Sequence, residues 1–339
     1  MLKTRTLFII GAGASAELDF PTGTELLFHI SQKLNFELDS LGKVQGDQKL
    51  WGAVERRCQE RSGNIQDYLV AAAEIRSGLN LAQSIDNYVH THADKPIFAD
   101  LAKLSIALFI LAAEETVIKN VPQKPLKAVT SKNDYWLSVF SRHHFAGYQA
   151  AALDSLFENV AFISFNYDRC IERNLRICVA NYFGLEDERA IEICSKVKIF
   201  YPYGSLGRLH PDGGTISLQF GASISPDSLI SAANNIRTFT EGDNDPGLSK
   251  NLPEILDWSK HIVFLGFGFI DLNMRLLGSA DTTGIPKKTF GTAYCMSEPN
   301  LRKLQQIIPQ QFFSPNAEPL RSDLKAYQFL NDYARHLFS

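Results

Sequence analysis

The sequence of 339 residues lacks the residue spacings that build metal sites or disulfide frameworks. It contains no Cys-x-x-Cys pair, and its five cysteines are scattered: Cys58, Cys170, Cys178, Cys194 and Cys295. This argues against a zinc ribbon and against a disulfide framework. His90 and His92 lack the i, i+4 spacing of a ligand pair on a helix, so we expect no bound metal. An odd number of cysteines without a recognisable secretory signal indicates a cytoplasmic protein.

Strong charge and long apolar runs are also lacking. The formal net charge is −3 and the pI is about 6.3, so no direct nucleic-acid binding is indicated. The most apolar segment, residues 104–113, is bounded by Lys103 and Glu114 and is far shorter than the roughly 20 residues of a membrane span. We therefore expect a buried core helix there and no membrane association.

What the sequence does contain is a glycine-rich turn directly after an apolar run near its start. Residues 8–10 have no polar interruption, as in the central strand of a parallel sheet covered on both faces. Gly11 and Gly13 follow, and without Cβ atoms their backbone N–H groups could approach a pyrophosphate. Ser15 could add a hydroxyl. A plain tight connection remains an alternative interpretation of this turn.

The fingerprint of an ordinary dehydrogenase is incomplete here. Ala16 stands where a third glycine is usual, and Glu37 and Asp39 lie in a polar loop, not after a second strand. Thr22 and Glu25 form a capping-box pattern, so a helix should begin near Thr22, beside the glycine turn. A capping role for Thr22 does not exclude contact with a ligand.

The periodicity of the chain predicts its organisation. Residues 36–159 show helical spacing without strand signals, which indicates a helical insertion or cap with polar loops near 40–48 and 120–133. Strand patterns occur at 160–165, 197–201, 215–220, 258–265 and 289–294, a polar loop at 234–250, and helices at 97–118, 274–277, 298–308 and 321–336. We predict an α/β fold: a doubly wound, mostly parallel Rossmann-like sheet with a large helical insertion and C-terminal helices. The predicted domains are 1–35 with 155–310, then 36–154, then 311–339.

Polar and small residues follow two of these strands. Asn166 and Asp168 come directly after 160–165, and residues past the carboxyl end of a strand face the ligand crevice of a doubly wound sheet. Asp168 could equally cap the helix that follows. Gly204 and Ser205, after the next strand, form a turn where backbone could again approach a ligand.

Four motifs now stand in order along the chain: Gly11–Ser15 (GAGAS), Ser164–Asp168 (SFNYD), Tyr203–Leu206 (YGSL) and Leu265–Asn273 (LGFGFIDLN). Together they resemble the sirtuin-like superfamily, specifically its bacterial branch of NAD-hydrolysing immune effectors. The resemblance covers roughly residues 1–35 and 155–300, the segments that are expected to form the sheet.

The resemblance implies a set of site residues. In that family the glycine turn lines the pyrophosphate and ribose of NAD, and the asparagine of the second motif is essential beside the nicotinamide ribose. Catalytic roles are thus implied for Asn166, Tyr203 and Asp168. NAD, as substrate and without a metal, is expected to contact these residues: Gly11, Ala12, Gly13, Ser15, Thr22, Phe165, Gly204, Ser205, Gly266, Phe267, Asp271 and Asn273.

Two departures from the family pattern bear on the chemistry. The deacylase branch has a four-cysteine ribbon, and Asp19-Phe-Pro-Thr-Gly23 replaces its acidic-arginine motif here, so lysine deacylation is not expected. The family also has a histidine before the glycine of the third motif, where this chain has Tyr203. A tyrosine with a pKa of about 10 could orient water but would serve poorly as a base. His210 could substitute, although a surface-loop histidine is the plainer interpretation.

The resemblance implies a gated NAD hydrolase of antiviral defence, acting by abortive infection. The bond to nicotinamide is already activated, so hydrolysis depends mainly on holding the ribose and placing water. Activation by oligomerisation or by a partner such as a nucleic-acid translocase or an Argonaute-like protein is expected, since unregulated NAD loss would kill the cell. The alternative is a non-catalytic subunit that binds NAD or ADP-ribose and regulates a defence complex.

Overall fold

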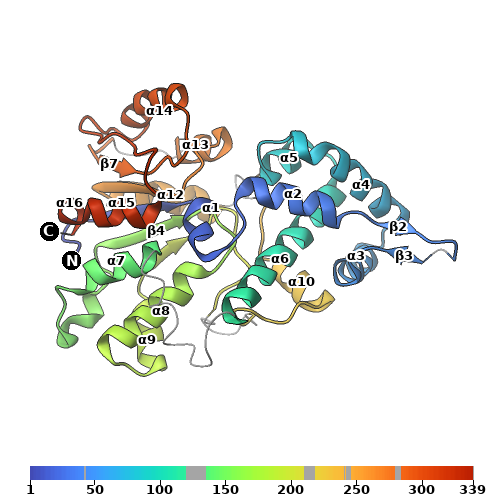
Figure 1. The fold of residues 1–339 in the computed structure, drawn as a ribbon, viewed down its shortest axis with the longest axis horizontal. Coiled ribbons are helices and arrows are strands. Elements are labelled where there is room, and N and C mark those ends of the chain that lie inside the picture. Colours follow the sequence, from blue (N-terminus) through green and yellow to red (C-terminus); the bar gives the residue numbers. More distant parts are fainter. Residues whose placement is uncertain are drawn as a thin grey trace.

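The computed structural model describes residues 1–41, 43–119, 135–209, 218–239, 241, 246–278 and 284–338 (Figure 1). His210 and the predicted loop at 120–133 lie outside these residues. So does most of the strand expected at 215–220; its last part, residues 218–220, is described and is not a strand. The backbone carbonyls of Leu218 and Gln219 instead accept hydrogen bonds from the Arg169 guanidinium.

Five parallel strands form the sheet. In chain order they are β1 (Thr6–Ile10), β4 (Val160–Ser164), β5 (Lys198–Phe200), β6 (His261–Leu265) and β7 (Lys288–Gly291). Their spatial order is β5-β4-β1-β6-β7, with β1 in the centre. The chain thus builds outward from β1 to β5 and then returns to the other side of β1, which is the strand order of a Rossmann-like fold. The predicted fold class is confirmed.

The apolar strands are uninterrupted because both faces of the sheet are covered. Successive side chains of β1 point to opposite faces, so Leu7 and Ile9 join one hydrophobic cluster while Phe8 and Ile10 join another. The second cluster is packed with aromatic rings; Phe8, for example, stacks on Phe162 and meets Phe140 edge-on.

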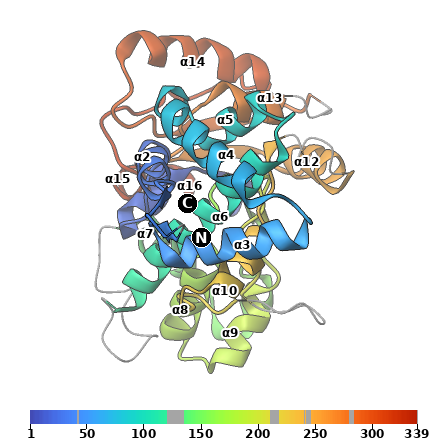
Figure 2. The same cartoon turned by 90° about the vertical axis from the view of Figure 1, so that its right-hand side faces the viewer.

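A helical lobe lies beside the sheet in Figure 1 and faces the viewer in Figure 2. It consists of α2 (Gly23–Lys33), α3 (Gln48–Glu60), α4 (Ile65–Gly78), η2 (Leu79–Leu81), α5 (Ile85–Thr91), α6 (Pro96–Lys119) and α10 (Pro226–Ala233). Helix α10 comes from far along the chain and packs against α3 and α6. By length and composition α6 could cross a membrane, but its apolar residues from Leu104 to Leu111 are buried except Phe109. The predicted core helix is confirmed.

The prediction that residues 36–159 contain no strands was wrong. A hairpin of β2 (Glu37–Leu38) and β3 (Val44–Gln45) follows α2. Its turn is closed locally, since Asp39 Oδ1 accepts the N–H groups of Leu41 and Lys43 at 2.9 and 2.8 Å. Such short pairs leave no alternation long enough to be seen in a sequence.

The other helices of the described residues belong to the part of the molecule that contains the sheet (Figure 1). They are α1 (Ala12–Ser15), η1 (Ala16–Leu18), α7 (Trp136–Phe145), η5 (Ala150–Ser155), α8 (Cys170–Phe183), α9 (Asp187–Cys194), α12 (Pro246–Trp258), α13 (Asp271–Gly278), α14 (Glu298–Gln311), α15 (Ala326–Asp332) and α16 (Ala334–Leu337). Helix α7, which falls inside the predicted insertion 36–154, packs against α8 and α15. The predicted domain boundaries stay a prediction.

Several predicted boundaries were wrong. Residues 246–250 belong to α12, where the polar composition indicated a loop; Pro246 fits the first turn, which needs no N–H. The predicted helix at 321–336 begins only at Ala326 and is split after Asp332. Arg321 instead forms an isolated bridge beside the end of β7, because it exchanges backbone hydrogen bonds with Gly291 and Ala293.

Candidate functional site

The first, second and fourth motifs begin at one level of the sheet, where their strands end. Ile10, the last residue of β1, lies in register with Ser164 of β4 and Leu265 of β6. The residues that follow these three strands therefore emerge side by side at the carboxyl edge. The strand order also reverses between β1 and β6, and in doubly wound sheets the ligand crevice lies at this switch point.

The glycine turns after β1 and β6 pack directly against each other. The Gly11 N–H donates to Leu265 O at 3.1 Å, and the Gly13 N–H donates to Gly266 O at 3.0 Å. A Cβ on Gly11 would lie 2.6 Å from Gly266 O, and one on Gly266, whose φ is +58°, would lie 2.0 Å from Ala14 N. These glycines are thus required by their mutual packing. The N–H groups of both Gly11 and Gly13 are engaged within the protein, whereas the sequence predicted that they would approach a pyrophosphate.

Asn166 joins the second motif to the first. Its side chain is 7% exposed, and its Nδ2 donates to Gly11 O at 3.0 Å and to Ser15 Oγ at 2.9 Å. The amide therefore holds the end of β4 against the glycine turn. Ser15, expected to offer its hydroxyl to a ligand, accepts this hydrogen bond.

Asp168, two residues further along, is used locally. Its Oδ1 accepts the Cys170 N–H at 3.0 Å, at the start of α8. The N-cap of α8 is Arg169, whose side chain makes no capping hydrogen bond, so Asp168 binds the first N–H of the helix from the position before the N-cap.

Tyr203, the first residue of the third motif, contacts the fourth motif. It is 2% exposed, and its hydroxyl donates to Asn273 Oδ1 of the fourth motif at 2.6 Å. Its ring meets Phe165 edge-on, and Phe165 in turn packs against Phe267. Burial raises the pKa of Tyr203 well above its usual value, so the phenol stays neutral near pH 7.

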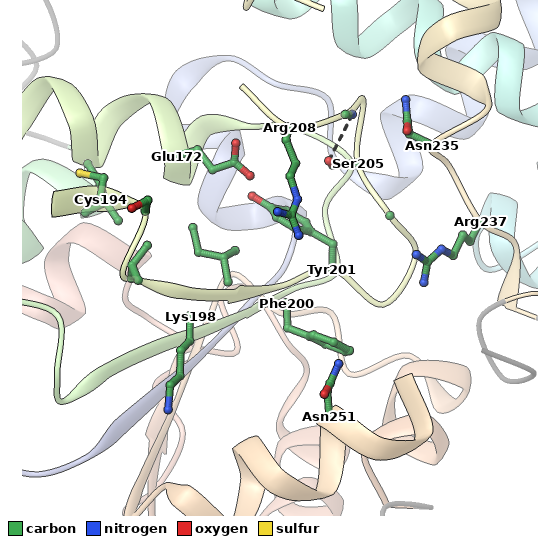
Figure 3. A pocket seen from close by; sticks show the side chains of 16 residues that line it. Glu172, Cys194, Lys198, Phe200, Tyr201, Ser205, Arg208, Asn235, Arg237 and Asn251 are labelled. Carbon is green, nitrogen blue, oxygen red and sulfur yellow. Dashed lines mark hydrogen bonds between the residues drawn. The ribbon is translucent and has the colours of Figure 1, made fainter. Parts of the chain in front are cut away.

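Gly204 and Ser205 lie at a separate cavity of about 650 Å³, beside the edge strand β5. In Figure 3, Glu172 and Arg208 reach toward Tyr201, while Arg237 and Asn251 lie on the other side. Burial raises the pKa of Glu172, although its Oε2 accepts the Leu209 N–H at 3.2 Å. Within the third motif, Tyr203 thus contacts the other motifs, whereas Gly204 and Ser205 line this cavity.

Three other predicted contact residues lie at or near the starts of helices. Thr22 caps α2 in a full capping box with Glu25, as predicted. Ala12 is half-buried in α1, and Asp271 is exposed in the first turn of α13. The structure brings Gly11, Gly13, Ser15, Asn166 and Gly266 together by direct hydrogen bonds, and Tyr203 with Asn273 by another.

Sequence reasoning missed one acidic residue, Asp86 in the first turn of α5. The helical lobe carries it to the segment after β4, where its Oδ1 accepts a hydrogen bond from the Tyr167 hydroxyl. Burial raises the pKa of Asp86 to about 6, and its charge contributes to the raised pKa of Tyr203. An aspartate in a first helical turn is ordinary, so the sequence held no signal of this contact.

Neither a family model nor a curated protein matches this chain. Among the described residues, no group of three or more His, Cys, Asp or Glu side chains is placed to hold a metal ion. The side chains at the carboxyl edge of the sheet are therefore the basis for inferring the chemistry of the site.

Proposed function

We propose that this chain is an NAD hydrolase, which cleaves NAD to nicotinamide and ADP-ribose as a gated effector of bacterial antiviral defence. The proposal extends the resemblance of the four motifs to the sirtuin-like superfamily. Its main support is the pair of hydrogen bonds from Asn166 to the glycine turn at the switch point of the sheet. An amide fixed in this position would lie beside a ribose whose pyrophosphate rests on the turn.

The proposed chemistry requires positioning more than strong acid–base groups. Nicotinamide leaves as a neutral molecule, and the positive charge that develops on the ribose is stabilised by fixed dipoles. Asn166 Nδ2 is held by Gly11 and Ser15, so the amide has one preset orientation. Gating belongs to the proposal: a partner protein, such as a translocase or an Argonaute-like protein, or self-association would switch the enzyme on.

The test is nicotinamide release from NAD by wild type, Asn166→Ala and Asn159→Ala, with and without the products of neighbouring genes. Asn159 is the matched control, since it lies just before β4 at the opposite end of the strand and donates to Leu2 O at 3.3 Å. We expect Asn166→Ala to lose on the order of 100-fold in turnover and Asn159→Ala to stay within about threefold. Thermal melts of each variant check that the fold is intact.

A non-catalytic NAD or ADP-ribose sensor is the second candidate. It is favoured by the third motif, where the neutral Tyr203 hydroxyl is already bonded to Asn273 and offers no base. Tight binding of NAD without nicotinamide release in every assembled state would support this candidate and contradict the hydrolase.

A further inference from the structure

We propose that Asp86 is the general base of this site: the helical lobe supplies the carboxylate that accepts a proton from the water that attacks the nicotinamide ribose. This inference rests on the proposed hydrolase function. It assigns the acid–base role to a residue outside all four motifs, on a different part of the fold from the sheet.

Other polar groups at the carboxyl edge are unsuited to act as the base. Tyr203 is a neutral phenol bonded to Asn273, and Asp168 is bonded to the backbone N–H of Cys170. Asn166 is an amide and cannot take a proton near pH 7. Among the described residues of this edge, Asp86 is the acidic side chain that reaches Tyr167, the neighbour of both Asn166 and Asp168.

Asp86 is held in place by its helix and by Tyr167. It is the second residue of α5, whose N-cap Ser84 accepts the Asn87 N–H at 3.0 Å, so the backbone around the carboxylate is fixed. Tyr167 donates to Oδ1 and thereby orients the carboxylate. Asp86 is half-buried and Tyr167 is 6% exposed, so the pair is shielded from bulk water but not sealed.

The surroundings of Asp86 raise the pKa of its carboxyl. Among the described residues, the titratable groups that face Asp86 are the Tyr167 and Tyr203 phenols, both neutral near pH 7, and on its own helix His90 lies one turn away with its ring against Phe239. Desolvation without a cation shifts the pKa of the carboxyl upward to about 6, which suits a base that works near neutral pH.

In the proposed step, water displaces nicotinamide at C1′ of the ribose. The water oxygen forms a bond to C1′ of the ribose while the C1′–N1 bond breaks, and its electron pair neutralises the pyridinium nitrogen of the departing nicotinamide. One proton of the water moves to an oxygen of Asp86 and is later released to solvent. The products are nicotinamide, ADP-ribose and one proton, and no oxidant or reductant is needed.

The experiment compares wild type with Asp86→Asn and Asp67→Asn in nicotinamide release across pH, with NAD binding measured separately by calorimetry. Asp67 is the matched control, an exposed aspartate in the first turn of α4 in the same lobe. We expect Asp86→Asn to lose about 100-fold in kcat with little change in NAD affinity, and Asp67→Asn to behave as wild type. The acidic limb of the kcat profile should disappear in Asp86→Asn.

Tyr167→Phe is the second variant and guards against a purely structural explanation. It removes the hydrogen bond that favours the charged carboxylate, so the acidic limb of the profile should move to higher pH while turnover above that limb persists. If wild type releases nicotinamide and Asp86→Asn retains more than about a third of its kcat, the base assignment is overturned and the hydrolase stands. If wild type binds NAD but releases no nicotinamide in any assembled state, both proposals fail.

Discussion

The segment that follows β4 is bonded to the helical lobe twice, and the two contacts are of opposite kinds. Arg169 meets Glu114 of α6 in an ion pair with both side chains 0% exposed, at 2.9 Å from Nε to Oε1 and 2.5 Å from Nη2 to Oε2. Tyr167 meets Asp86 of α5, half-buried, through a single hydrogen bond from a neutral phenol. One contact pairs a charge with a countercharge, and the other does not.

The Arg169–Glu114 pair is suited to holding the lobe against the sheet, whereas the Tyr167–Asp86 contact is suited to catalysis. Burial raises the pKa of both carboxyls, but at Glu114 the two bonds from Arg169 act in the opposite direction. Glu114 Oε2 also accepts the Gly221 N–H at 3.0 Å, so both of its oxygens are bonded within the protein. Asp86 has no cationic partner among the described residues, and its charged form is favoured by the neutral donor Tyr167 instead.

The largest expected effect comes from breaking the ion pair. Arg169→Met leaves Glu114 buried without its cation and should lower the free energy of unfolding by about 3–5 kcal/mol. Chemical denaturation followed by tryptophan fluorescence measures this change. Glu114→Gln combined with Arg169→Met should recover much of the loss, because neither charge then remains.

The control for this experiment is Arg302→Met. Arg302 forms an i, i+4 pair with Glu298 whose side chains are 72% and 63% exposed, and its loss should change stability by less than about 0.5 kcal/mol. Equal effects of the two arginine variants would show that the buried pair is not a joint between lobe and sheet.

The second expected effect is on the pH dependence of stability. The pKa of Asp86 is about 6 in the folded chain and about 3.9 in an unfolded one, so folding favours the protonated form. Its stabilising contribution is complete below about pH 4 and is lost as the pH rises through 6. Asp86→Asn, neutral throughout, should therefore be about 1–3 kcal/mol more stable than wild type at pH 7.5 and similar to it at pH 4.

Unfolding curves at several pH values test whether Asp86→Asn is more stable than wild type at pH values above the pKa of Asp86. A variant that gains stability while losing turnover has lost a group kept for function. If Asp86→Asn is instead destabilised equally at both pH values, Asp86 is a structural link like Glu114 and the distinction between the two contacts fails.

Local patterns predicted the sheet and its polar edge. Uninterrupted apolar runs gave β1, β4 and β6, and the capping box at Thr22 gave the start of α2, because each depends on residues close in sequence. Asn166 lies where the sequence placed it, at the carboxyl end of β4. The sequence predicted that the glycines allow a ligand to approach the backbone. In the structure, Gly11 and Gly266 exclude side chains because their turns touch each other, a contact that no local pattern reveals.

The contacts between lobe and sheet could not be predicted. Tyr167 and Asp86 are 81 residues apart, and Arg169 and Glu114 are 55 apart, so only the packed fold brings them together. Glu114 ends an apolar run and was useful in the sequence only as a boundary. Arg169, which comes from the other part of the molecule, offsets part of the cost of its burial.

The smallest expected effect lies at a third contact of the lobe, where Lys103 of α6 donates to both carboxylate oxygens of Glu241 at 2.8 and 2.6 Å. The glutamate side chain is 50% exposed, so solvent weakens the pair. Lys103→Met should cost about 0.2–1 kcal/mol, and the difference from wild type should shrink between about 0.1 M and about 1 M salt. The loss at Arg169→Met should persist over the same range, because the buried pair is screened much less. A salt-insensitive loss at Lys103 would mean that packing of its alkyl stem, not its charge, accounts for the effect.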